Sequence, residues 1–207
     1  MSAPSAAADP EPLAIEITVF GGYRIGGAFE DIPDDDAGTV DVDESLASGP
    51  KQKLKDTPFF GLTLNVEQTE DAYYEFSYSR QSSELQRDPA FDLTVEYLHL
   101  GGLLQFSEPN DRVIPYFSMT VGATRFTPDQ AGLDTETEFS VGIGGGLKFP
   151  IAKHFGLRLE ARGYITFLDS NANIFCASAN GSAGCDIRVR SDTFFQAQAL
   201  LGVTASF

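Results

Sequence analysis

The sequence contains no tryptophan, two cysteines, two histidines and few basic residues. Its 14 lysines and arginines stand against 30 aspartates and glutamates, which gives a formal net charge of −16. We expect no nucleic-acid partner, because binding phosphates along a nucleic acid requires a basic surface. No run of 18 apolar residues occurs in the chain, so the sequence predicts no membrane-spanning helix.

What the chain does contain favours strands and turns. It has 207 residues, of which 42% are hydrophobic and 12% aromatic, with 20 glycines, 11 prolines and 17 phenylalanines. This composition is too apolar for a disordered acidic protein. We therefore expect an all-β protein, and the length allows one large domain or two small ones.

Apolar and polar residues alternate with period two along most of the chain, which is typical of strands. Between residues 157 and 167, for example, apolar or small side chains alternate with Arg158, Glu160, Arg162, Tyr164 and Thr166. The pattern predicts eight strands, at 13–27, 57–67, 72–81, 91–106, 113–126, 137–149, 156–167 and 193–207.

The connections between these segments alternate between longer and shorter, which is typical of outer-membrane barrels with short periplasmic turns and longer extracellular loops. A soluble lipocalin-like barrel is the rival, but the chain lacks the tryptophan and the final helix expected there. We predict an eight-stranded antiparallel up-and-down transmembrane β-barrel over 13–207, with both termini periplasmic. Residues 1–12 are expected to form a flexible leader, because they lack the basic and apolar regions of a signal peptide.

The last strand, ALLGVTASF, has apolar residues at alternate positions back from Phe207. It resembles the signal by which the outer-membrane assembly machinery engages its substrates. The stretches YLHLGGLLQF, PYFSMTVGATRFTP and FSVGIGGGLKFPIAKHFGLRLEARGYITF resemble the small eight-stranded outer-membrane β-barrel proteins of Gram-negative bacteria, the OmpA-like and opacity-protein group. The resemblance implies a multi-pass outer-membrane protein, expected to be a monomer in contact with membrane lipid and lipopolysaccharide.

The resemblance supports fold and location better than activity. We expect a structural protein with a polar lumen filled by side chains, or a narrow conduit for small solutes. The alternative is a surface binding or adhesion module acting through the extracellular loops 28–56 and 168–192. No cofactor or metal site is predicted, because the acidic loop 28–56 lacks the spacing of a calcium loop.

Eight charged residues are expected in the lumen, where buried charges must pair. They are Glu16, Glu75, Glu96 and Glu160, together with Arg24, Lys148, Arg158 and Arg162. One interpretation is a polar core that stabilises the barrel. The other, implied by the OmpA resemblance, is a plug whose ion pairs exchange partners to open a narrow ion path.

The segment 91–106 contains a conflict of parity. Phe91, Leu93, Val95 and Tyr97 would face lipid by one reading, whereas Leu98, Leu100, Leu104 and Phe106 would face it by the other. We expect a β-bulge near Tyr97–His99 to reconcile the two readings.

An enzyme is not expected, because no lipid-facing set of nucleophile, base and acid is evident around His99 or His154. We therefore predict no catalytic residues.

Two further features lie toward the extracellular side. Cys176 and Cys185 are expected to form a disulfide within the last loop, since no histidine or further cysteine lies nearby to complete a metal site. Five arginines are expected near the outer ends of their strands, where they would contact lipopolysaccharide phosphates. These arginines are Arg24, Arg80, Arg125, Arg188 and Arg190.

Overall fold

The structure is a computed structural model that describes residues 14–30, 51–86, 91–108, 111–129, 134–168, 173–179, 182–188 and 193–207. Within these ranges, no helix has the length and hydrophobicity that crossing a membrane requires. The expected leader 1–12 lies outside the described residues.

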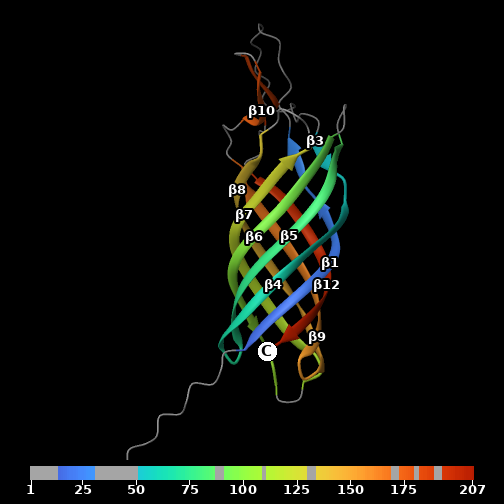
Figure 1. The fold of residues 1–207 in the computed structure, drawn as a ribbon, viewed down its shortest axis with the longest axis vertical. Helices are drawn as coiled ribbons and strands as arrows, with labels where there is room; N and C mark the ends of the chain where they lie inside the picture. Colours follow the sequence, from blue (N-terminus) through green and yellow to red (C-terminus); the bar gives the residue numbers. More distant parts are fainter. Residues whose placement is uncertain are drawn as a thin grey trace, which may run out of the picture.

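Eight long antiparallel strands close into a barrel, as the period-two pattern predicts (Figure 1). They are β1 (Ile15–Gly26), β4 (Thr57–Thr69), β5 (Ala72–Gln86), β6 (Phe91–Gln105), β7 (Ile114–Pro128), β8 (Glu136–Ala152), β9 (Phe155–Phe167) and β12 (Thr193–Ser206). Each strand pairs with its neighbour along the chain, and β1 closes the ring by pairing with β12. The predicted eight-stranded up-and-down barrel is confirmed.

The two ends of the barrel differ. At the turn end, β1 begins beside the chain's last residue, and short turns join β4 to β5 and β8 to β9. At the loop end, the long connections carry four short strands that the sequence did not predict. These are β2 (Ala28–Glu30), β3 (Lys51–Leu54), β10 (Asn173–Ala179) and β11 (Ser182–Arg188).

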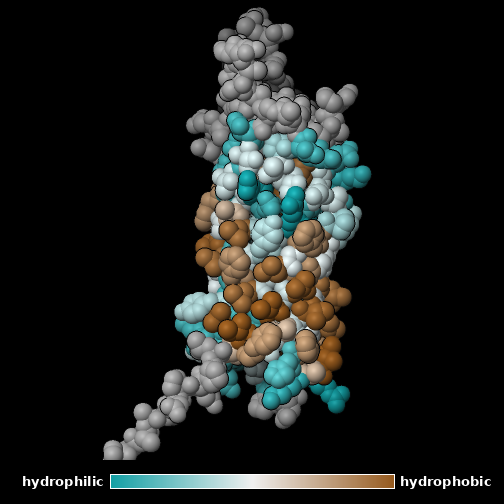
Figure 2. Space-filling model, in the orientation of Figure 1, coloured by the Kyte–Doolittle hydropathy of each residue, from teal (hydrophilic) through white to brown (hydrophobic). Residues whose placement is uncertain are grey.

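The outer surface of the barrel carries an apolar belt, visible in Figure 2 on the part nearer the turn end. Outward-facing residues of β7 illustrate it: Phe117, Met119 and Val121 are all 42–51% exposed. Because lipid rather than water surrounds this part of a membrane barrel, apolar side chains point outward and polar ones inward. Hydrophilic residues replace the belt toward the loop end (Figure 2).

Strand β6 runs from the apolar belt into the hydrophilic part of the outer surface. This change of surroundings explains its two conflicting apolar patterns without a bulge. Its pairing with β5 runs without a register shift from Leu104 opposite Ala72 to Phe91 opposite Leu85. The predicted bulge is therefore wrong, as is the lipid-facing position of Leu93, Val95 and Tyr97. These three side chains are 0–1% exposed and lie inside the barrel. Near the loop end, the outward-facing residues of β6 lie beyond the apolar belt and are polar, and the apolar residues of the strand pack inward.

Candidate functional site

The lumen is the candidate functional site, and its loop end is closed by an apolar layer. Leu93, Val95, Phe126 and Phe194 are fully buried there. The rings of Phe126 and Phe194 meet edge to face, with centroids 5.2 Å apart. Such edge-to-face contacts are favoured between aromatic rings. This layer separates the polar lumen below it from the loop end.

Arg24, on β1, lies below this layer and is completely buried. Its guanidinium donates to Gln198 Oε1, at 3.0 Å from Nε and 2.7 Å from one terminal nitrogen, and to Ser79 Oγ at 2.6 Å. The Tyr97 ring stacks against it, with 4.7 Å from Cζ to the ring centre. The prediction that Arg24 contributes to a lipopolysaccharide-binding rim is wrong, because its position in β1 points the side chain into the lumen.

His99 lies in the same part of the lumen, also fully buried. Its Nδ1 is 3.0 Å from Thr120 Oγ1 and its Nε2 is 2.9 Å from Ser140 Oγ. Both ring nitrogens are thus engaged by hydroxyl groups, and neither of these two partners is the carboxylate that would orient a Ser–His pair for nucleophilic chemistry. The arrangement is that of a satisfied buried histidine.

Four charged residues join opposite walls of the barrel at the centre. Glu75 comes from β5, whereas Arg158, Glu160 and Arg162 come from β9, four strands away in either direction around the ring. Arg158 contacts Glu75 at 2.7 Å and Glu160 at 2.6 Å. Arg162 contacts the same two carboxylates at 2.5 and 2.6 Å. The cluster is electrically neutral and spans the lumen.

Glycines on β8 provide the space for this cluster. A Cβ at Gly144 would lie 3.0 Å from Arg162 Nε, and one at Gly146 would lie 2.6 Å from Tyr116 Oη. The Tyr116 hydroxyl in turn donates to Glu160 Oε2 at 2.6 Å. The small residues of this strand therefore make room for large polar side chains from its neighbours.

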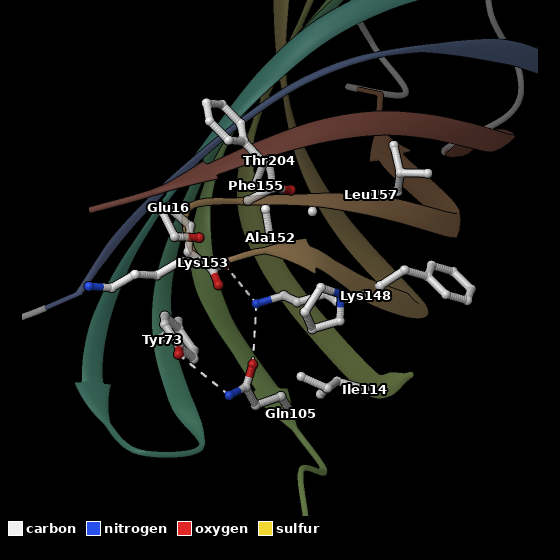
Figure 3. A pocket seen from close by; sticks show the side chains of 14 residues that line it. Glu16, Tyr73, Gln105, Ile114, Lys148, Ala152, Lys153, Phe155, Leu157 and Thr204 are labelled. Atoms are coloured by element: carbon white, nitrogen blue, oxygen red, sulfur yellow. Dashed lines mark hydrogen bonds and ion pairs between the residues drawn. The ribbon is translucent and has the colours of Figure 1, made fainter. Parts of the chain in front are cut away.

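The turn end of the lumen opens into a pocket of about 240 Å³ (Figure 3). Lys148 Nζ lies 2.7 Å from Glu16 Oε2 and 3.3 Å from Gln105 Oε1. It also lies 4.6 Å from the centre of the Tyr73 ring, a cation–π contact. This second ion pair lines the base of the lumen beneath the central cluster.

Glu96 is not a lumen residue, and that prediction is wrong. It lies opposite Arg80 on β5 and Arg125 on β7, with its side chain on the outer face of the barrel. Its Oε1 accepts a hydrogen bond from the Tyr78 hydroxyl at 2.5 Å. The misplacement follows from the expected bulge, which assigned the wrong face to the first half of β6.

Of the five arginines predicted to form the rim, Arg80 and Arg125 are exposed on the outer face near the loop end. Arg188 lies at the end of β11, and its side chain is outside what the structure describes; Arg190 lies outside the described residues. Of the predicted rim, the structure therefore describes two exposed arginine side chains, Arg80 on β5 and Arg125 on β7.

The remaining predicted residues lie at the two ends of the barrel. Cys176 and Cys185 are opposite each other in the β10–β11 ladder, a placement compatible with a disulfide, but their side chains are not described and the bond stays a prediction. Phe207 exchanges backbone hydrogen bonds with Ile15 at 3.0 and 3.2 Å. Its role as an assembly signal also stays a prediction. Among the described residues, no group of His, Cys, Asp and Glu side chains could hold a metal ion.

The closed ring of eight strands, its outward apolar belt and its polar lumen define an integral β-barrel of the outer membrane. The outer membrane protein beta-barrel domain family matches residues 1–186, and the chain belongs to this family. It is accordingly a multi-pass outer-membrane protein. No curated protein sequence matches the chain.

Solved structures of the same fold are distant in sequence. Neisserial surface protein A is 12% identical with a TM-score of 0.58, and covers 94% of this chain and 99% of its own. Outer membrane protein AlkL, studied in lipid bilayers, is 11% identical with a TM-score of 0.56, covering 100% and 96%. OprG from Pseudomonas aeruginosa is 11% identical with a TM-score of 0.52, covering 93% and 95%. At these identities the likeness shows the fold alone.

Sequence reasoning missed the uncharged members of the lumen. The buried contact between the Tyr97 hydroxyl and Gln196 Oε1, at 2.9 Å, also joins strands four places apart in the ring. Gln198 and Ser79 likewise hold Arg24. The alternating pattern of β12 and β5 indicates that these residues face the lumen. It does not indicate which residues they contact across the barrel.

Proposed function

We propose that this protein is a structural component of the outer membrane whose lumen is closed to solutes. The observation that supports this most directly is the central cluster, because it connects β5 to β9 across the full width of the ring. The void bordered by Arg158, Glu160 and Arg162 has no room for a water molecule. A barrel of eight strands has an interior that side chains can fill.

The layers above and below the cluster support the same proposal. Tyr97 and Gln196 form a second connection across the ring, and the apolar layer with Phe126 lies above it. The pair of Lys148 and Glu16 lies below. A solute would have to displace buried side chains at several successive levels, which is costly in a close-packed interior.

Solute flux into proteoliposomes tests this function. Vesicles containing the protein are expected to exclude small neutral sugars as well as vesicles of lipid alone, while a known diffusion pore in matched vesicles admits them. Sugar entry at a rate that rises with the amount of folded protein would overturn the proposal.

A narrow ion conduit is the second candidate, and the shared partners of the cluster favour it. Because each arginine contacts both carboxylates, Arg162 can release Glu75 while keeping Glu160. Planar-bilayer recording distinguishes the two functions. Brief conductance events that become more frequent in Arg162→Gln support the conduit, whereas silent bilayers for both proteins support the structural function.

Surface binding through the loops is the remaining alternative. At the loop end, β2 and β3 pair beside the end of β5, and the β10–β11 hairpin lies beyond the ends of the barrel strands (Figure 1). Deletion of residues 31–50 tests this alternative: loss of binding to host or surface ligands in a variant that keeps its folded barrel would favour it.

A further inference from the structure

Three polar side chains from three strands meet at the base of the lumen. Glu16 on β1 and Asn65 on β4 are cross-strand partners, whereas Lys148 reaches across the lumen from β8. Lys148 Nζ lies 2.7 Å from Glu16 Oε2 (Figure 3), and Asn65 Nδ2 donates to the same oxygen at 3.3 Å. One carboxylate oxygen therefore holds both an amine and a carboxamide from opposite walls of the ring.

Protein surrounds this group on most sides. Asn65 is 0% exposed, and the Lys148 and Glu16 side chains are 9% and 14% exposed. The Tyr73 and Tyr116 rings lie 4.6 and 6.0 Å from Lys148 Nζ. The turn-end pocket, which Glu16 and Lys148 line, gives the group an outlet toward the periplasm. A small product formed here can leave by this route.

The Asn65 amide is incompletely bonded. Within the described parts of the chain, its Oδ1 atom is buried and has no hydrogen-bond partner. A buried carbonyl oxygen without a donor is unfavourable, because the water that it lost is not replaced. Once protonated, Glu16 can supply this donor through its O–H group. A proton that moves from Lys148 to Glu16 therefore provides a donor for the amide at the same moment as it frees a nucleophilic amine.

We propose that Lys148 and Asn65 form an intramolecular amide bond, with Glu16 carrying the protons. Glu16 takes a proton from Lys148 Nζ, and the electron pair freed on Nζ attacks Cγ of Asn65. Glu16 delivers this proton and a second one from Nζ to Nδ2, the Cγ–Nδ2 bond breaks, and Nδ2 leaves with the bonding pair as ammonium. One ammonium group and one carboxamide thus become one secondary amide and one ammonium ion, and the step needs no oxidant or reductant.

The lysine stem gives Nζ the reach that the attack requires. Reacting atoms must approach to about 3–3.5 Å, and a flexible four-carbon stem lets Nζ turn from the Glu16 oxygen to the amide bonded to that same oxygen. The new bond would join β4 to β8, which lie four strands apart in either direction around the ring. It would fix the base of the lumen covalently, so this modification is independent of whether the ion pairs above it exchange partners.

Gln105 is the competing amide, because its Oε1 lies 3.3 Å from Lys148 Nζ. Its Nε2 donates to the Glu70 carbonyl and to the Tyr73 hydroxyl, at 3.2 and 3.4 Å. A backbone carbonyl or a neutral phenol takes up a proton less readily than a carboxylate does. We therefore assign the bond to Asn65, whose nitrogen already contacts a carboxylate.

Intact-mass spectrometry of the full-length protein tests the proposal, because formation of the amide removes one molecule of ammonia. The protein is purified unfolded in urea, refolded into detergent micelles and denatured again for measurement. The unfolded starting material should have the mass of its sequence, and the refolded wild type should be lighter by one ammonia. Digestion should then release a branched peptide that links Asn65 to Lys148.

Three variants identify the roles of the three residues. Asn65→Asp should lose one water in place of one ammonia, because oxygen is then the leaving group. Glu16→Gln should keep its full mass, since an amide cannot carry the protons. Lys148→Arg keeps the positive charge beside Glu16 but removes the nucleophile, and it should also keep its full mass. It serves as the control for succinimide formation at an asparagine, which releases ammonia without a lysine.

Three results would each overturn the proposal: full mass in the refolded wild type after prolonged incubation, an equal loss of ammonia in Lys148→Arg, or a branched peptide that contains Gln105 in place of Asn65. The mobility difference between unheated and boiled protein on detergent gels verifies that every variant is folded.

Discussion

Replacement of Glu75 by glutamine tests the central cluster most directly. Glu75 is 1% exposed and contacts Arg158 and Arg162, which come from the opposite wall. Glu75→Gln keeps the shape of the side chain but leaves two buried arginines against one carboxylate, Glu160. Removing one partner from a buried ion pair costs about 3–5 kcal/mol, because the remaining charge is buried without compensation. We expect a loss of this size in the free energy of unfolding.

Glu84→Gln is the matched control on the same strand. The Glu84 side chain is 46% exposed and lies 3.9 Å from Lys55, so its loss should cost less than about 1 kcal/mol. The double variant Glu75→Gln/Arg162→Gln restores neutrality and should be less destabilised than the sum of its single variants. Unfolding is measured by urea titration in detergent micelles, with the folded fraction read from far-ultraviolet circular dichroism. A midpoint for Glu75→Gln equal to that of Glu84→Gln would refute the reasoning.

Three further predictions concern packing, the loop cysteines and the closed barrel. Gly146→Ala should lower the free energy of unfolding by about 1–3 kcal/mol, and with it the urea midpoint, because its Cβ would lie 2.1 Å from the Leu159 carbonyl oxygen. Gly102→Ala should change the midpoint little, because its Cβ would meet only the Tyr73 carbonyl oxygen, at 3.7 Å. Equal midpoints for the two variants would contradict this. Cys176 and Cys185 should resist thiol labelling in denatured, unreduced protein, and complete labelling of both would show that no disulfide forms. Unheated protein should migrate differently from boiled protein on detergent gels, since a closed barrel has no free edge; identical mobility would argue against it.

The fold was predictable because two signals in the sequence are local. Alternation with period two marks each strand, and the lengths of the connections indicate which ends lie together. Strand β9 shows apolar alternation along its whole length, so its inward residues, including Arg158 and Arg162, were assigned to the correct face.

Strand β6 shows where this reasoning fails. Apolar alternation indicates that one face of a strand is apolar. It does not indicate whether that face contacts lipid outside the barrel or packs inside the barrel. Leu93 and Val95 were assigned to lipid because the strand was assumed to stay in the membrane, and Glu96 was misplaced with them. Continuing the alternation of β6 without a break from Leu98 back to Glu96 would have placed both side chains on the outer face.

Partners across the lumen depend on information that the sequence does not contain locally. The contact of Glu75 with Arg162 requires the stagger of the strands, the reach of both side chains and the space left by Gly144. Arg24 was given the correct strand and height, but its partners on β5 and β12 are uncharged and carry no pairing signal in the sequence.

The change from apolar to charged residues on the outer face, at Arg80 and Arg125, fixes the depth at which the barrel sits in the membrane. A shift of one pleat toward the periplasm, about 5 Å along the membrane normal, would draw Arg80 and Arg125 into hydrocarbon and expose apolar belt residues at the turn end to water. A charged residue on the lipid face costs up to about 2–4 kcal/mol at the midplane, so movement in that direction is opposed at both edges. The barrel is free to rotate and diffuse in the plane of the membrane, but not to slide through it.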